Sequence, residues 1–170
     1  MTDTMRIMVR PQRPGDGERL ARAWLDAGRH YADLAPETFQ VPDSEGLAEF
    51  LELAPDVDGR NDILRVVAEV DGRVVGTAVG RLEAPDRSAR YQLQRQLAQT
   101  RLIVDVLVVE EEFRRHGVGA RLMEALEEWG RERGAAVALL DTYPESALSR
   151  PFFEERMGYR RRSMRLIKRL

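Results

Sequence analysis

Cysteine is absent from the 170-residue chain, and histidine occurs only twice, as His30 and His116. The lack of cysteine excludes disulfides, thiolate zinc sites, iron–sulfur clusters and a cysteine nucleophile. Two histidines are too few for a histidine-rich metal centre, so we expect no metal. No apolar run approaches the roughly 20 residues that span a membrane. Residues 1–10 alternate and carry charge, unlike a signal peptide. We therefore expect a cytoplasmic protein without a membrane span.

An excess of positive charge is also missing. The chain has 27 Lys and Arg against 29 Asp and Glu, for a formal net charge of −2. This balance argues against nucleic acid as a partner, because nucleic-acid binding usually needs a basic face. The basic stretch at residues 160–169 is a local exception. On a terminal strand, such charges more often deter edge-to-edge aggregation.

The length and the recurrence of apolar segments predict one folded domain covering residues 1–170. Apolar periodicity and turn residues divide it into alternating elements. The expected strands cover residues 5–10, 63–70, 73–82, 101–109, 135–140 and 159–170. The expected helices cover residues 16–33, with Asp16 as N-cap, 44–53, 117–133 and 146–157. Residues 56–62 are a predicted loop. Residues 84–99 are predicted to be an exposed loop or a short helix, with Tyr91, Leu93 and Leu97 as its few anchors.

Two glycine features refine this pattern. Asp71-Gly72 is favoured in type I′ hairpin turns, so the strands on either side should pair. Gly76 and Gly80 indicate a bulge or a close backbone approach in the second of these strands. Residues 101–109 are almost continuously apolar, which predicts a strand buried on both faces in the interior of the sheet.

The segment after this apolar strand carries the chemistry. Residues 110–119 read Glu-Glu-Glu-Phe-Arg-Arg-His-Gly-Val-Gly and lead into a helix. A helix N-terminus exposes unpaired N–H groups and a partial positive charge, which favour phosphate. A dinucleotide fingerprint would need glycine in place of Leu122, and a nucleoside-triphosphate loop would need Gly-Lys-Ser/Thr. Both fail. From spacing alone, an ordinary helix start with glycine turns stays equally open.

The run Arg114-x-x-Gly117-x-Gly119 resembles motif A of the GNAT superfamily of acetyl-CoA-dependent N-acetyltransferases. Residues 7–16 resemble the family's first strand and Asp-led helix, and the hairpin at Asp71-Gly72 resembles its second and third strands. Residues 152–159 resemble its terminal motif, Phe-Tyr-Glu-x-x-Gly-Phe. The resemblance covers nearly the whole chain. It implies an α/β (α+β) fold with a mixed, mostly antiparallel sheet flanked by helices.

The resemblance implies acetyl-CoA (coenzyme A) as the cofactor. In the family, the strand before motif A splays from its neighbour, and its backbone pairs with the pantetheine arm. By position, the backbone groups would be those of Leu107, Val108 and Val109, whose side chains can still pack in the core. The pyrophosphate would lie on the amides of Arg115, His116, Gly117, Val118, Gly119 and Ala120, with Arg114 adding charge.

Family members often use a strand carboxylate as the general base. Asp105 is the only acid inside the apolar strand and by simple alternation shares a face with Leu107 and Val109. Burial would raise its pKa, which suits a base. The alternative is a structural Asp paired with a nearby arginine. Glu110 is the second candidate, although residues 110–112 are more simply a solvated turn.

The general acid is where the chain departs from the family, because the tyrosine of the terminal motif is missing. Its place falls on Glu154 or, with a one-residue insertion, on Phe153. Tyr143 is the spare phenol that we favour as the catalytic acid. Tyr159 is expected to pack as the terminal aromatic, and water can also protonate the leaving thiolate.

The predicted activity is direct transfer of an acetyl group from acetyl-CoA to a primary amine. The acceptor is a small molecule or a peptide, and residues 24–39 and 84–99 should form its side of the cleft. A homodimer is left open. The rival prediction is a non-catalytic acyl-CoA-binding or interaction domain of the same fold, and a third is transfer of a longer acyl chain.

Overall fold

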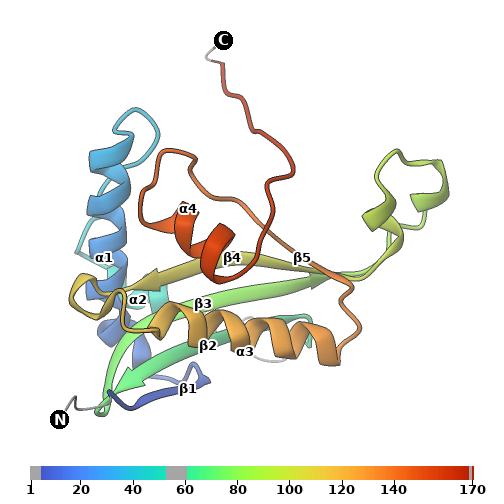
Figure 1. Ribbon diagram of the computed structural model, residues 1–170. Coiled ribbons are helices and arrows are strands. Elements are labelled where there is room, and N and C mark those ends of the chain that lie inside the picture. Colours follow the sequence, from blue (N-terminus) through green and yellow to red (C-terminus); the bar gives the residue numbers. More distant parts are fainter. Residues whose placement is uncertain (1–4, 53–60, 169) are drawn as a thin grey trace.

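The sheet of the computed structural model, which describes residues 5–52, 61–168 and 170, has five strands in this part of the chain (Figure 1). They lie in sequence order: β1 (Ile7–Pro11), β2 (Ile63–Val70), β3 (Arg73–Glu83), β4 (Arg101–Val109) and β5 (Val137–Leu140). The first four pair antiparallel, and β4 pairs parallel with β5. The predicted mixed, mostly antiparallel sheet is confirmed, with β4 inside it.

Helices cover both faces of this sheet. They are α1 (Asp16–Leu34), α2 (Leu47–Glu52), α3 (Val118–Glu132) and α4 (Ser149–Pro151), which continues into a π-helical turn at Phe152–Arg156. Strand β2 shows how one sequence supplies two faces, because successive side chains point to opposite sides. Val66 and Ala68 pack in the cluster that includes Leu122 and Leu126 of α3. Val67 packs with Leu20 of α1 and with α2.

The glycine features of β3 match their prediction. Asp71 and Gly72 both have positive φ, 51° and 81°, as a type I′ turn requires. A Cβ on Gly76 would lie 2.7 Å from the Val108 carbonyl oxygen, so β3 and β4 approach closely there. The β3–β4 register shifts at Gly80, where a bulge interrupts the ladder.

This bulge changes which way β4 directs its side chains. The register passes from Val79–Val106 to Gly80–Val104 and skips Asp105. An extra residue resets the alternation of a strand. As a result, Leu102 and Val104 before the bulge, and Leu107 and Val109 after it, all pack in the cluster facing α3. The expectation that Asp105 shares the face of Leu107 and Val109 is therefore wrong, because simple alternation fails at a bulge.

Several other expectations differ from the structure. Residues 159–168 and 170 form no strand, and Met164, Leu166 and Ile167 are 80–88% exposed because no apolar face receives them. Of the three expected anchors, Tyr91 and Leu93 are exposed and Leu97 is half-buried, and residues 84–99 extend away from the sheet (Figure 1). The helix after β5 starts later than expected, at α4. Residues 56–60 of the predicted loop lie outside the described residues.

A buried ion pair fixes the start of α1. The helix is capped by Gly15, and Asp16 is its first residue rather than its N-cap. The Asp16 carboxylate accepts two hydrogen bonds from Arg10 of β1, at 2.8 and 2.9 Å, and one from the Arg13 N–H at 2.7 Å. Arg10 also binds Glu69 of β2. Burial alone would raise the pKa of Asp16, but these hydrogen bonds outweigh it and hold the pKa below its ordinary value.

We expect Asp16→Ala to lower the free energy of unfolding by about 3 kcal/mol, because it leaves Arg10 buried with one carboxylate fewer. Glu18→Ala, at an exposed acid of the same helical turn, is the control and should cost much less. Chemical denaturation at several pH values measures both. A lowered pKa stabilises the fold above the unfolded value of about 3.9. The difference between wild type and Asp16→Ala should therefore shrink as the pH falls below that value; a difference independent of pH would contradict the assignment.

Candidate functional site

Strands β4 and β5 separate halfway along β4. Strand β5 pairs only with Arg101–Val104, so in the described chain no strand covers the same edge of β4 beyond Val104. The Glu110 N–H donates to the Val75 carbonyl at 2.8 Å, which sets the alternation of the antiparallel ladder. Val108 therefore directs its backbone groups toward β3, whereas Leu107 and Val109 direct theirs to the open edge. The splayed strand is present, with two of the three expected residues facing the gap.

The loop between β4 and α3 is shaped to present backbone N–H groups. Arg115 and Gly117 both adopt left-handed backbone conformations, with φ of 64° and 88°. Gly117 is the N-cap of α3, and no side chain caps the helix. The first N–H groups of α3 therefore lack the acceptor that a capping side chain would supply, and the helix dipole adds to their attraction for an anion. Successive N–H groups in such a turn also form an anion-binding concavity.

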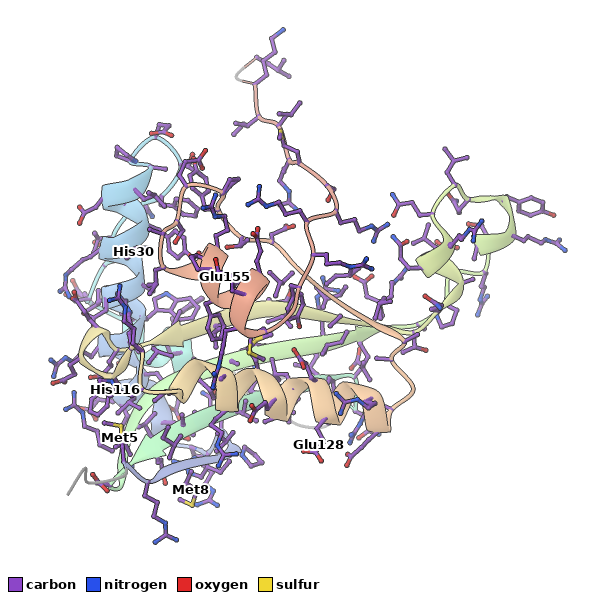
Figure 2. The ribbon with its side chains drawn as sticks, in the orientation of Figure 1. Met5, Met8, His30, His116, Glu128 and Glu155 are labelled. Carbon is purple, nitrogen blue, oxygen red and sulfur yellow. The ribbon has the colours of Figure 1, made fainter. Side chains whose placement is uncertain are left out.

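The remaining predicted loop residues surround this helix start. Arg115 and His116 are exposed, and Figure 2 shows His116 in the loop before α3. Val118 and Ala120 are buried and offer only their backbone. A Cβ on Gly119 would lie 3.3 Å from the ring of Phe152, in the segment after α4. The loop, the α3 N-terminus and this segment thus meet at one place.

Arg114 has a different role from the other loop residues. Its Nε donates to the Val109 carbonyl oxygen at 3.1 Å. This bond occupies one of the backbone groups on the open edge of β4 and ties the loop to the strand. The side chain is half-buried, and the sequence could not show this contact because it depends on the turn between them.

Glu110 is not the solvated residue that the sequence predicts. Its side chain is 2% exposed and pairs with Arg73 and, at 3.6 Å, with Arg22. Burial raises the pKa of Glu110, and the two arginines oppose that rise. Glu111 and Glu112 are exposed as expected. Glu110 is thus a buried, ion-paired residue and not part of a solvated turn.

Asp105 differs from its prediction in the opposite sense, because it is not buried. Its side chain is 37% exposed, and Arg81 pairs with it at 3.0 Å. Arg81 lies opposite Ile103, so Asp105 projects from the face of the sheet away from α3. The physical reason is the bulge, which turns this residue out of the core. These contacts are those expected for the alternative to a general base, a structural aspartate paired with a nearby arginine.

Tyr143 stands three residues beyond β5, where β4 and β5 have diverged. Its ring packs edge-on against Phe39, whose ring in turn contacts Tyr31. His30 lies beside Tyr31 on α1 (Figure 2), and its Nε2 is 3.2 Å from the Ser146 hydroxyl. Burial lowers the pKa of His30, and the charge of Arg114 adds to this. The sequence pattern does not reveal this cluster, because its members come from distant segments of the chain.

Phe153 and Glu154 are the two residues of the terminal motif that align with the family's tyrosine, and Phe153 lies in the core. This side chain is 8% exposed and packs edge-on against Phe152 and Tyr159. Tyr159 is the packing aromatic that was expected, and its hydroxyl donates to Glu127 at 2.9 Å. Burial, reinforced by Glu127, raises its pKa. Glu154 is paired with Arg161, which holds its pKa below the ordinary value. No phenol occupies either aligned position.

We expect Phe153→Tyr to lower the free energy of unfolding by about 1–3 kcal/mol, because the new hydroxyl would be buried without a hydrogen-bond partner. Phe152→Tyr is the control: Phe152 is only half-buried, so its hydroxyl can reach water. Thermal and denaturant unfolding measure both variants. If Phe153→Tyr is as stable as wild type and turns over acetyl-CoA faster, position 153 faces the cleft instead of the core.

Within the described residues, no helix has the length and apolar character needed to cross a bilayer. The same part of the chain holds no group of three or more His, Asp or Glu arranged to bind a metal ion. These findings concern the described residues alone.

Solved structures resemble this chain over nearly its whole length. A mutant of the BH1408 protein from Bacillus halodurans matches with a TM-score of 0.79 and 19% identity, over 96% of this chain and 99% of that one. The aminoglycoside N-acetyltransferase AAC(6')-Iy in complex with CoA matches with a TM-score of 0.66 and 16% identity, over 100% and 98%. Glucosamine-6-phosphate N-acetyltransferase from Arabidopsis thaliana matches with a TM-score of 0.63 and 16% identity, over 96% and 98%. At these identities, the likeness shows the fold.

No curated protein matches the chain. The family model of the acetyltransferase (GNAT) family matches residues 22–159, which include β2–β5, the loop before α3 and the segment after α4. This span exceeds half of the sequence and contains the splayed strand and the uncapped helix start described above. The chain therefore belongs to the acetyltransferase (GNAT) family.

Proposed function

We propose that this protein transfers an acetyl group from acetyl-CoA to a primary amine. The observation that carries the proposal is the combination at the end of β4: an open strand edge beside a helix start whose N–H groups lack a capping side chain. An open edge offers backbone donors and acceptors to an amide-containing chain, and the helix start offers donors to phosphate. Coenzyme A contains both kinds of group in sequence.

The residues present fit this donor. The backbone of Leu107 and the N–H of Val109 would hold the pantetheine arm, since the Val109 carbonyl already accepts from Arg114. The amides from Arg115 to Ala120 would hold the pyrophosphate, with Arg115 adding positive charge. Gly119 has no side chain, and a Cβ there would lie 3.3 Å from the Phe152 ring, so this turn packs closely against the segment after α4. When bound, acetyl-CoA supplies an activated acetyl thioester. The chain itself must orient this thioester, accept a proton from the acceptor amine and donate a proton to the leaving thiolate.

Asp105 is our proposed base for the acceptor amine. A primary amine must lose a proton to attack a thioester, and a carboxylate can accept it directly or through water. Asp105 leaves the core at the bulge, one residue past the last β4–β5 pair, and its exposure lets an acceptor or a water reach it. Arg81 holds the carboxylate in place.

Tyr143 is our proposed acid for the leaving thiolate. It follows β5, just beyond the point where β4 and β5 stop pairing, and its ring packs against the ring of Phe39. Aromatic and polar groups lie beside it, supplied by His30, Tyr31 and Phe39. We therefore propose that this end of α1 and the turn after it form the side of the site that binds the acceptor amine. This matches part of the segment, residues 24–39, that the sequence indicates for the acceptor.

A specific observation favours the second candidate, a non-catalytic acyl-CoA-binding domain. Phe153 is buried, and Glu154 is paired with Arg161, so neither aligned residue can serve as the family's phenol. In this reading the donor site is retained and Tyr143 is only a packing residue.

The test is an acetyl-transfer assay with a panel of amines, including an aminoglycoside, an amino sugar phosphate and a peptide with a free N-terminus. Release of free coenzyme A and the mass of the acetylated amine are measured together. Amine-dependent release of coenzyme A, lost in Tyr143→Phe, supports the enzyme and its acid. Binding of acetyl-CoA without transfer to any amine of the panel supports the non-catalytic domain.

A further inference from the structure

Arg73, the first residue of β3, makes contacts with three residues of the loop before α3. Its guanidinium pairs with Glu110 and, at 2.8 Å, with Glu112. It also lies over the ring of Phe113, 5.1 Å from the ring centroid. Arg73 is thus bound to the loop on both sides of Glu111, although it lies 37 residues from Glu110 in sequence.

Helix α1 adds further contacts to the same loop. Arg22 pairs with Glu110 at 3.6 Å and with Glu112 at 3.1 Å. The Asp26 carboxylate accepts a hydrogen bond from the Glu111 N–H at 3.0 Å. Arg22 is 60% exposed, so its ion pairs are weaker than those of a buried group. Arg73 combines two carboxylates and an aromatic ring on one side chain.

The burial of Glu110 makes its pairing with Arg73 important. A buried carboxylate that loses a partner is strongly unfavourable, and without Arg73 the Glu110 carboxylate keeps only the 3.6 Å contact to the exposed Arg22. Loss of Arg73 should therefore loosen the loop. A pocket of about 290 Å³ lies beside the pair and is lined by Arg19, Arg22, Arg73 and Glu110 among others. It gives the Glu110 carboxylate a way to turn toward water, which would shift the segment between Val109 and Gly117.

We infer that Arg73 is a positioning residue for the acetyl donor. Through Glu110, Glu112 and Phe113 it holds the loop in the conformation that aims the amides of residues 115–120 at the pyrophosphate, without touching the donor itself. The inference rests on the proposed donor site, and it assigns a role to a residue that neither the glycine motif nor the open strand edge includes.

The decisive variant is Arg73→Met, which keeps an unbranched apolar stem and removes the guanidinium. We expect the Kd for coenzyme A and the KM for acetyl-CoA to rise roughly 3- to 30-fold. At saturating acetyl-CoA, kcat should stay near the wild-type value, because Arg73 does not contact the reacting groups. A fall in kcat with unchanged KM would overturn the inference.

Arg133→Met is a matched control. Arg133 is 43% exposed against 44% for Arg73, lies 5.0 Å from the centroid of the Trp129 ring and pairs with Glu132. It stands at the far end of α3 from the loop. Its loss should leave the Kd unchanged. If both variants weaken binding equally, the effect is general destabilisation and the inference fails.

Hydrogen exchange of the free protein separates this inference from the proposed function. In Arg73→Met, the amides of residues 110–117 should exchange faster than in wild type, while those of β2 and of the second half of α3 keep their rates. This readout needs no coenzyme A. Unchanged exchange in the loop would overturn the inference even if wild type binds coenzyme A. Faster exchange in a protein that binds no coenzyme A would leave Arg73 holding the loop but refute both the donor site and the role inferred from it.

Discussion

Replacing Gly119 with glutamate is expected to abolish binding of coenzyme A while the protein stays folded. The residue lies in the first turn of α3, where the uncapped N–H groups would hold the pyrophosphate. A carboxylate placed there repels the phosphates, and such like-charge contacts cost several kcal/mol, or at least about 100-fold in Kd. Isothermal titration calorimetry measures the Kd, and thermal unfolding measures the fold.

Two controls separate charge from crowding at Gly119. Gly119→Gln has nearly the size of glutamate without its charge, and Gly119→Ala adds only the Cβ that would lie 3.3 Å from Phe152. The ring must shift by a few tenths of an ångström, so a small loss of stability is expected in all three variants. Glutamate should weaken binding far more than glutamine. Wild-type affinity in Gly119→Glu would place the phosphate site elsewhere.

Asp105→Asn is expected to slow acetyl transfer by about 10²- to 10⁴-fold, the usual effect of removing a general base. The amide keeps the size of the side chain and cannot accept the proton of an ammonium group. The Kd for acetyl-CoA should not change, because Asp105 lies on the face of β4 away from α3. Steady-state turnover and calorimetry measure the two effects.

Glu83→Gln is the matched control for Asp105→Asn. Both acids pair with Arg81, and their exposed fractions are 38% and 37%. Losing an ion pair to Arg81 is therefore common to both variants. Glu83→Gln also loses its pair with Arg101, at 3.1 Å, whereas the base is lost only in Asp105→Asn. Equal turnover in the two variants and in wild type would reassign the general base to Glu110 or to water.

The elements that follow local rules could be predicted from the sequence. Strand β2 and the Asp71-Gly72 turn have the expected bounds, because alternation and positive φ are local properties. Helix α3 begins and ends within a residue of its expected limits, since Gly117 and Gly134 bracket its apolar stripe. The loop of the proposed donor site can be singled out in the sequence for the same reason, since its glycines lie close together.

The misses depend on contacts between distant residues. The sequence does not show that a bulge skips Asp105, because the extra residue is defined only against β3. Glu110 reads as part of an acidic run, and only the fold brings Arg73 and Arg22 around it. The tail at residues 159–170 has the composition of a strand, but a strand also needs a neighbour, and in the described chain none pairs with it.

Binding of acetyl-CoA to the wild-type protein tests the account most directly. Calorimetry should show a single saturable site, and the same ligand at 100 times its Kd should raise the free energy of unfolding by about 2.7 kcal/mol. Both readouts depend on the open edge of β4 and the start of α3, and neither requires the acceptor to be known. Saturable heat with matching stabilisation is the predicted result. The absence of both at millimolar acetyl-CoA would contradict the donor site on which the proposed function rests.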